Sequence, residues 1–200
     1  MADMVSAIIA REAKEALSPL GLTRRGRSRV WIDDRGWWLI NVEFQPSDWG
    51  KGCYLNVGHQ HLWVKRDHLV FEDHERPLGG TSFVQFRGDE VEFASAVSQA
   101  SRVAADAVLR RRSAHGEAKK ALRRVADSRD DLNGGIAAAV LGKGKLAEKR
   151  LRGLVHPAYQ DQAAQFMGLD QDQADTLARQ SVTITRQLLR LPAEWSDWST

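Results

Sequence analysis

Two stretches near residue 50 alternate apolar and polar side chains as a half-buried β-strand does. In the first, the apolar positions are Trp38, Ile40, Val42 and Phe44. In the second, they are Cys53, Leu55 and Val57. Successive side chains of a strand point to opposite faces of the sheet, so this spacing predicts one buried face. A seven-residue connection with two glycines joins the stretches, and residues 36–58 therefore predict an antiparallel hairpin.

The segment before the hairpin has a helical period instead. Its apolar residues form one stripe, made of Val5, Ile8, Ile9, Ala13, Ala16, Leu17 and Leu20. This spacing predicts an amphipathic helix that stops at Pro19 and Gly21 and covers the apolar face of the hairpin. Shorter runs predict further strands at residues 30–32, 61–71 and 82–86.

From residue 89 to residue 190 the pattern is helical. Asp89 and Glu92 form a capping box ahead of the first of these helices. We expect later helices at residues 118–125, 136–154, 162–167 and 174–189, with breaks at Asn133–Gly135 and Gly168–Asp170. The tail carries Trp195 and Trp198, which we expect to dock on the body of the protein.

These elements predict an α+β fold. It has an N-terminal helix, an antiparallel sheet of about four to five strands, and a helix-rich C-terminal half. We place a boundary after residue 115. Residues 1–115 form the α+β domain, and residues 116–200 form a helical extension that packs on it.

Composition and charge narrow the class of protein. The chain is 42% hydrophobic and 28% charged, as globular proteins are. No apolar run approaches the ~20 residues of a membrane span, so we expect no membrane partner. Asp3 and a short apolar run at residues 7–10 do not fit a secretion signal, and Cys53 alone cannot form an internal disulfide. We therefore expect a cytoplasmic protein; no feature of the sequence indicates an oligomeric state.

Three segments together have the pattern of a known family. They read LSPLGLTRRGR at residues 17–27, NVEFQPS at residues 41–47 and GCYLNVG at residues 52–58. Over roughly residues 5–110 the chain resembles the bacterial proteins grouped as domain-of-unknown-function family 4304, although Leu22 stands where that family usually has an aromatic residue. The resemblance implies an α+β fold and no activity. Some members look like components of bacterial conflict loci, so it also implies an immunity or defence-associated role.

The second face of the hairpin is the candidate binding surface. It carries Trp37, Asn41, Glu43, Gln45, Tyr54 and Asn56. Such side chains can hold a partner by hydrogen bonds on a rigid platform. We expect a non-enzymatic protein that binds a protein partner here. Alternatively, this face is solvated or lies beneath the C-terminal helices. We assign no catalytic residue, because Glu43 has no second carboxylate at a defined separation.

A basic segment supports an alternative function. Residues 101–155 carry 14 Lys or Arg against 6 Asp or Glu. On helices, Arg112, Lys119, Arg123 and Lys149 can contact phosphates, as a nucleic-acid-binding protein requires. The segment lacks aromatic residues for base stacking, however. A solvated helix face or an acidic protein partner explains the charge equally well.

A histidine cluster supports a second alternative, a metal-dependent enzyme. His59 and His61 are two apart on the predicted strand, so they leave the same face. With a third ligand such as His68 or His74, they can hold a divalent metal. Alternatively, both continue the buried face as half-buried polar residues. We expect no organic cofactor, because the glycine pattern at residues 142–147 follows a helix rather than a strand.

Overall fold

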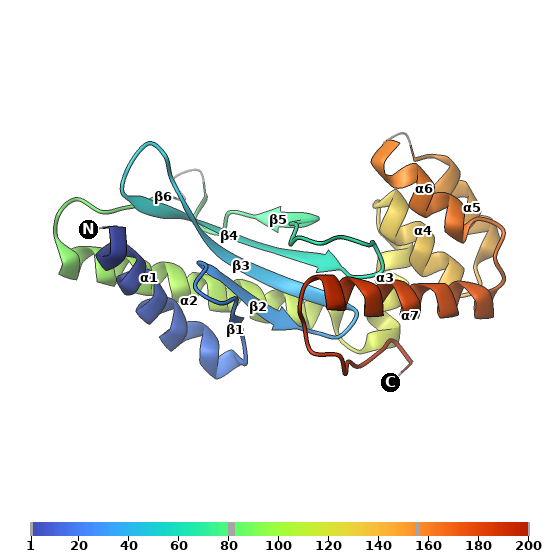
Figure 1. The fold of residues 1–200 in the computed structure, drawn as a ribbon, viewed down its shortest axis with the longest axis horizontal. Coiled ribbons are helices and arrows are strands. Elements are labelled where there is room, and N and C mark those ends of the chain that lie inside the picture. The colour runs from blue at the N-terminus through green and yellow to red at the C-terminus, as the bar shows by residue number, and fades with distance from the viewer. Residues whose placement is uncertain (1, 80–82, 155–156, 200) are drawn as a thin grey trace. The chain divides into compact units, whose positions relative to one another are not determined.

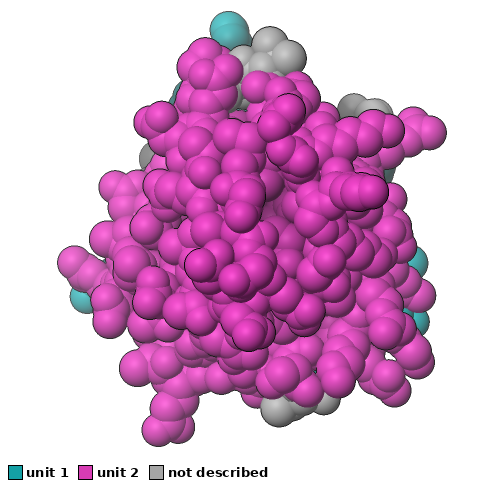
Figure 2. All heavy atoms as spheres, turned by 90° about the vertical axis from the view of Figure 1, so that its right-hand side faces the viewer, with its two compact units in different colours: residues 1–60, 70–113 teal, residues 61–69, 114–200 magenta. Residues whose placement is uncertain are grey.

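The computed structural model describes residues 2–79, 83–154 and 157–199. Its contacts divide the chain into two compact units, coloured separately in Figure 2. The first contains Met1–Gln60 and Val70–Ser113, and the second contains His61–Leu69 and Ala114–Thr200. The second unit thus takes in His61–Leu69, a segment from the interior of the predicted α+β domain.

The first unit is built on one antiparallel sheet (Figure 1). Its elements are α1 (Ala2–Leu17), the 3-10 turn η1 (Ser18–Leu20), β1 (Thr23–Arg24), β2 (Val30–Asp34), β3 (Trp38–Pro46), β4 (Gly52–His61), β5 (Asp73–Glu75), β6 (Phe83–Gln85) and α2 (Glu90–His115). The described strands follow the order β1-β2-β3-β4, and both β5 and β6 pair with the outer edge of β4. The predicted α+β class is confirmed.

One of the strand predictions differs from the structure. The strand expected at residues 61–71 is wrong, because β4 ends at His61 and the next paired segment is β5 at Asp73–Glu75. The strand expected at residues 82–86 corresponds to β6, while Ser82 itself lies outside the described residues.

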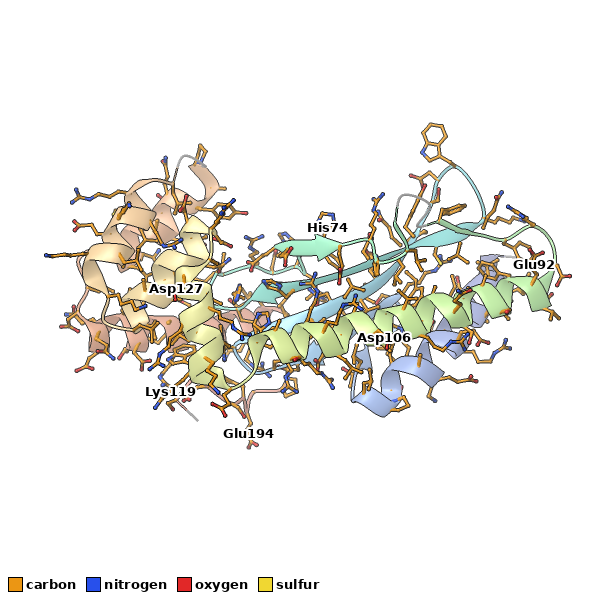
Figure 3. The ribbon with its side chains drawn as sticks, turned by 180° about the vertical axis from the view of Figure 1, so that it is seen from behind. His74, Glu92, Asp106, Lys119, Asp127 and Glu194 are labelled. Atoms are coloured by element: carbon orange, nitrogen blue, oxygen red, sulfur yellow. The ribbon has the colours of Figure 1, made fainter. Side chains whose placement is uncertain are left out.

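Alternation along β3 and β4 produces the predicted buried face. The side chains of Trp38, Ile40, Val42, Phe44, Cys53, Leu55 and Val57 are at most 5% exposed. Helix α2 runs along the strands on one side of the sheet (Figure 3) and buries Phe93, Val97, Ala104 and Val108 at helical spacing.

One buried ion pair fixes α2 to that side of the sheet. Arg112 of α2 makes two 2.8 Å hydrogen bonds to the carboxylate of Asp33 on β2, and it also donates to the Leu20 carbonyl oxygen at 2.6 Å. Asp33 pairs across the sheet with the buried Ile40. The guanidinium therefore joins the sheet, α2 and the end of η1 in one contact.

The second unit is a group of helices around one buried helix. They are α3 (Ala118–Asp127), α4 (Asp131–Val140), α5 (Gly144–Arg152), α6 (Pro157–Phe166) and α7 (Gln171–Leu188). From Leu132 to Val140 every residue of α4 is buried, and α3, α5, α6 and α7 all contact it. In the part of the chain that the structure describes, no helix has the length and apolar character needed to span a membrane.

The predicted break at Asn133–Gly135 is wrong. Asp130 caps α4 by accepting a hydrogen bond from the Asn133 backbone N–H, so the helix starts before the glycines and runs through them. A Cβ on Gly135 would lie 2.5 Å from Leu151 Cδ2. These glycines serve close packing against α5 instead of ending a helix.

The C-terminal tail docks within the second unit, as its tryptophans predict. Trp198 is 4% exposed and donates from Nε1 to Asp175 Oδ1 at 2.7 Å. The Arg179 guanidinium lies 5.1 Å from the Trp198 ring centroid and also pairs with Asp197. Partial burial raises the pKa of Asp197, but hydrogen bonds from Ser199 and Arg179 outweigh it and lower the pKa from 3.8 to about 2.

We expect Asp197→Asn to lower the free energy of unfolding by about 1–2 kcal/mol at neutral pH. Because the folded-state pKa is depressed, Asp197 contributes its full stabilisation above pH 3.8 and loses it as the pH falls towards 2. Urea unfolding of both proteins from pH 7 to pH 3 measures this. The gap between them should narrow below pH 4, and a gap that does not change with pH would contradict the assignment.

Candidate functional site

The polar face of β3 and β4 has a closed end and an open end. Asn41, Glu43 and Gln45 share this face of β3, while Tyr54, Asn56, Gly58 and Gln60 share it on β4. Asn41 and Gln60 are completely buried, whereas Gln45 is exposed and Glu43 and Tyr54 are half-buried. The face is therefore only partly available to a partner.

At the closed end, two buried amides hold the backbone of Val70. Asn41 Nδ2 donates to the Val70 carbonyl oxygen at 3.0 Å, and the Val70 N–H donates to Gln60 Oε1 at 3.0 Å. The neighbouring Phe71 leaves no room for a side chain at Gly58, where a Cβ would lie 2.7 Å from Phe71 Cδ1. We call this pair of bonds the Val70 clamp. Asn41 thus serves the fold, and the chain at Val70–Phe71 covers this end of the face.

Trp37 belongs to the closed part as well. Its side chain is 1% exposed, so it offers no surface to a partner. The alternation predicted Trp37 on the polar face because it is an even number of residues from Asn41. Alternation alone does not show which end of a sheet face is covered.

At the open end, four side chains remain together. Asn56 Nδ2 donates to Gln45 Oε1 at 2.9 Å and lies 3.4 Å from Glu43 Oε2. The amide of Asn56 is thereby oriented, and its Oδ1 has no hydrogen-bond partner among the described residues. Tyr54 lies beside them on β4, and we call Glu43, Gln45, Tyr54 and Asn56 the open polar patch.

Two residues that the sequence analysis missed border the open polar patch. The Phe83 ring centroid lies 4.8 Å from that of Tyr54, and the Arg76 guanidinium lies 5.3 Å from the Tyr54 centroid. Both come from segments whose pairing with β4 is not visible in local sequence. Gln60, in contrast, continues the alternation of Tyr54 and Asn56, and a longer predicted strand would have included it.

The basic candidates separate into one structural and three surface residues. Arg112 is held by Asp33 in the ion pair described above. Lys119 (labelled in Figure 3) and Arg123 lie one turn apart on the exposed side of α3, and Lys149 is exposed on α5. These three make no ion pair with any described residue. Phosphate contacts by this segment therefore depend on Lys119, Arg123 and Lys149 without Arg112.

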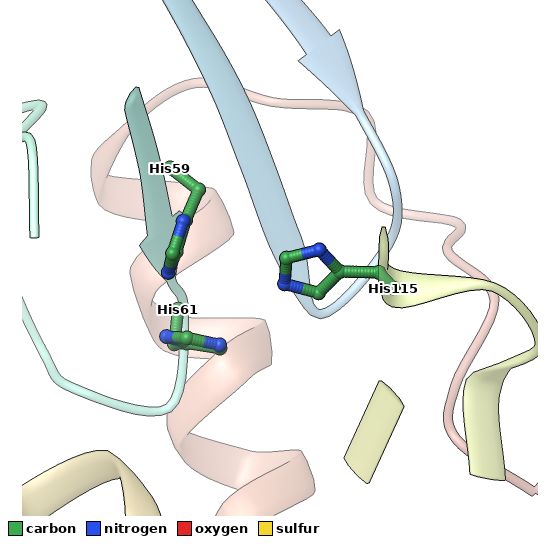
Figure 4. A group of neighbouring side chains, drawn as sticks. All are labelled: His59, His61 and His115. Carbon is green, nitrogen blue, oxygen red and sulfur yellow. The ribbon is translucent and has the colours of Figure 1, made fainter. Parts of the chain in front are cut away.

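The predicted metal ligands are only partly brought together. His59 and His61 follow each other on one face of β4, and His115 is the last residue of α2 (Figure 4). His61 and His115, which both belong to the second unit, each place a ring nitrogen within 4.8 Å of the other. His61 is buried and stacks on Trp63 at 5.1 Å between centroids, while Arg111 Nη1 lies 3.2 Å from His59 Nδ1.

The other two predicted ligands lie elsewhere. His68 is exposed and its Nδ1 pairs with Asp67 at 2.8 Å. His74 is exposed on β5 (Figure 3). Neither joins a group of possible metal ligands among the described residues. His115 was missed because it is distant in sequence and sits at a helix end without any local metal-binding motif.

Comparisons of the chain with family models, with curated proteins and with solved structures found no match. The resemblance to family 4304 therefore stays a prediction.

We expect the two ends of the polar face to respond differently to substitution. Asn41→Ala removes the donor to a buried carbonyl and should lower the free energy of unfolding by about 1–3 kcal/mol. Gln45→Ala, its matched control at the open end, should change it by no more than about 0.5 kcal/mol. Urea unfolding of the two variants measures both values. Equal losses would show that the open end is also structural.

Proposed function

We propose that this chain is a non-enzymatic binding protein that holds a protein partner on the open polar patch. The observation that carries the proposal is the orientation of the Asn56 amide by Gln45 and Glu43. Asn56 is only 7% exposed, and its bonds hold the exposed Gln45 and the half-buried Glu43 in place, so these two side chains lose little entropy when a partner binds. The same patch offers a carboxylate from Glu43 and a phenol from Tyr54, so it can both donate and accept hydrogen bonds.

The rigid support beneath the patch favours recognition of another protein. The strands that carry the patch are fixed from below by the buried face of the sheet and at one end by the Val70 clamp. Tyr54 and Arg76 belong to the residue types that dominate protein interfaces. The arrangement is a platform with an aromatic centre and polar surroundings, which is the usual anatomy of an interface.

The absence of an acid–base pair in the open polar patch favours binding over catalysis. Within the patch Glu43 is the one carboxylate, and hydrolytic mechanisms of the glycosidase type need two at a defined separation. The resemblance to family 4304 supports an immunity or defence-associated role for this binding, in which the partner is a protein encoded by a neighbouring gene.

Site-specific photocrosslinking tests the proposal in the native host. We expect a photoreactive phenylalanine analogue at Tyr54, and another at Gln45, to give a covalent adduct with the same protein, identified by mass spectrometry. The same analogue at Lys14, an exposed position on α1, should not give that adduct. The purified partner should then bind wild type at least ten times more tightly than Tyr54→Ala.

Two outcomes would contradict the proposal. One is an adduct pattern at Tyr54 and Gln45 that matches the pattern at Lys14. The other is unchanged affinity for Tyr54→Ala when thermal melting shows that the variant is folded.

As a second candidate we propose that the histidines bind a divalent metal. His61 and His115 both belong to the second unit. Their ring nitrogens lie within 4.8 Å of each other, and imidazole nitrogen is a ligand that suits Zn²⁺. The sulfur-free, nitrogen-only donor set does not favour Mg²⁺ or Ca²⁺, which prefer oxygen.

Zn²⁺ titration tests this second candidate. We expect one equivalent of Zn²⁺ to raise the melting temperature of wild type and of His68→Ala, because His68 lies outside the group. His61→Ala and His115→Ala should bind at least tenfold more weakly, measured by competition with a chelating dye. A shift of equal size in all four proteins, or in none, would remove this candidate.

A further inference from the structure

A cavity of about 440 Å³ lies beneath the β3–β4 connection, within the first unit. Its lining comes from the connection itself (residues 46–52), from Val5 and Ser6 of α1, and from Arg29 just before β2. The volume falls in the range of small-molecule pockets. None of these residues belongs to the open polar patch, so the cavity is a separate feature.

Arg29 is the central charged group of this cavity. It donates from Nη2 to Ser6 Oγ at 2.9 Å and from Nη1 to the Gly52 carbonyl oxygen at 3.3 Å. A guanidinium has five N–H donors, so others remain after these two bonds. No carboxylate among the described residues pairs with Arg29, although its side chain is half-buried. By contrast, the comparably buried Arg112 is fully engaged by Asp33.

The geometry around Arg29 is fixed by backbone constraints. Gly52 has φ of +148°, and a Cβ there would lie 2.1 Å from the Val84 carbonyl oxygen, so only glycine fits. Its carbonyl, one of the two acceptors for Arg29, is therefore held in place. The other acceptor, Ser6, lies on α1, and the guanidinium is thus positioned from two elements.

The rim of the cavity adds an aromatic surface and a second cation. Trp49 is 96% exposed, while the described large apolar side chains of the sheet are mostly buried. Its backbone N–H donates to Ser47 Oγ at 3.1 Å, which fixes the turn that carries it. Lys51 is exposed nearby, and Asp48 is the acidic residue of the lining. Arg29 is less exposed to solvent than Asp48, so its field is screened less and the cavity favours an anion.

We propose that this cavity, which we call the Arg29 pocket, binds a carboxylate carried on an aromatic or apolar body. A guanidinium accepts a carboxylate through two parallel N–H···O bonds. The indole of Trp49 then covers the apolar body of the ligand. The carboxylate can belong to a small organic acid or to the free C-terminus of a partner chain, and these sources differ in how far the ligand extends beyond the pocket.

Titration followed by ¹H–¹⁵N NMR of the full chain tests the proposal. The Trp49 indole signal is assigned by its loss in Trp49→Phe. We expect phenylacetate to shift this signal and the backbone amides of residues 47–51 saturably. Phenylacetamide, which has the same ring without the charge, should bind at least tenfold more weakly. Equal binding of the two compounds, or no saturable shift with phenylacetate, overturns the proposal.

A second pair of probes distinguishes the two sources of the carboxylate. Acetyl-Gly-Gly-Phe with a free C-terminus is compared with its C-terminal amide. Tenfold tighter binding of the free peptide than of phenylacetate assigns the pocket to a chain end. Tighter binding of phenylacetate assigns it to a small acid. In both cases the amide should bind weakly, and an amide that binds as well as the acid overturns the proposal.

Variants separate binding from folding. Arg29→Gln should abolish the preference for phenylacetate over phenylacetamide, but it also removes two structural hydrogen bonds. Trp49→Ala and Lys51→Ala alter only exposed side chains and should weaken phenylacetate binding at unchanged melting temperature. Lys14→Ala, another exposed lysine of the same unit, is the matched control and should bind as wild type does. Wild-type affinity in both Trp49→Ala and Lys51→Ala would contradict the proposed role of the rim.

Discussion

The backbone N–H and carbonyl of Val70 decide how much of the polar sheet face is available. Asn41 and Gln60 lie on neighbouring strands and are fully buried, and a buried amide without a partner costs about 1–3 kcal/mol. Each finds its partner in the backbone of Val70: Asn41 donates to its carbonyl oxygen, and Gln60 accepts from its N–H. The chain must therefore cross the sheet at Val70, and what it covers is removed from the surface. The open polar patch is the part of the face that this crossing leaves.

The sequence predicts the faces of the hairpin well because their cause is local. A strand has a period of two, so Leu55 and Asn56 must point in opposite directions wherever the strand lies. The same argument correctly joins Asn41 to Gln45 and Tyr54 to Asn56. It fails at Asn41 because the burial of that residue depends on a segment almost thirty residues later. Periodicity shows which residues share a face of the sheet, but it does not show which distant segment of the chain covers that face.

Helix boundaries in the second unit show the same limit. Asn133–Gly135 has the composition of a break, and intrinsic propensity disfavours glycine inside a helix by about 1 kcal/mol. The Asp130 cap and the close approach of α5 offset that cost, because side chains at Gly134 and Gly135 would collide with Arg150 and Leu151. The sequence did not predict His115 as a possible metal ligand for a similar reason. Its position depends on where the long helix α2 ends, and no short sequence motif indicates that end.

Two arginines show that the role of a charged side chain depends on its position in the fold and not on the net charge of its segment. Arg112 belongs to the most basic part of the chain, yet its guanidinium is fully used by Asp33 and the Leu20 carbonyl. Arg29 belongs to the net acidic part, yet it is half-buried and no carboxylate among the described residues pairs with it. Partial burial makes the charge costly, and hydrogen bonds to one hydroxyl and one carbonyl do not neutralise it. A carboxylate from outside the chain would neutralise the charge of Arg29. The cavity beside Arg29 has room for the group that carries this carboxylate.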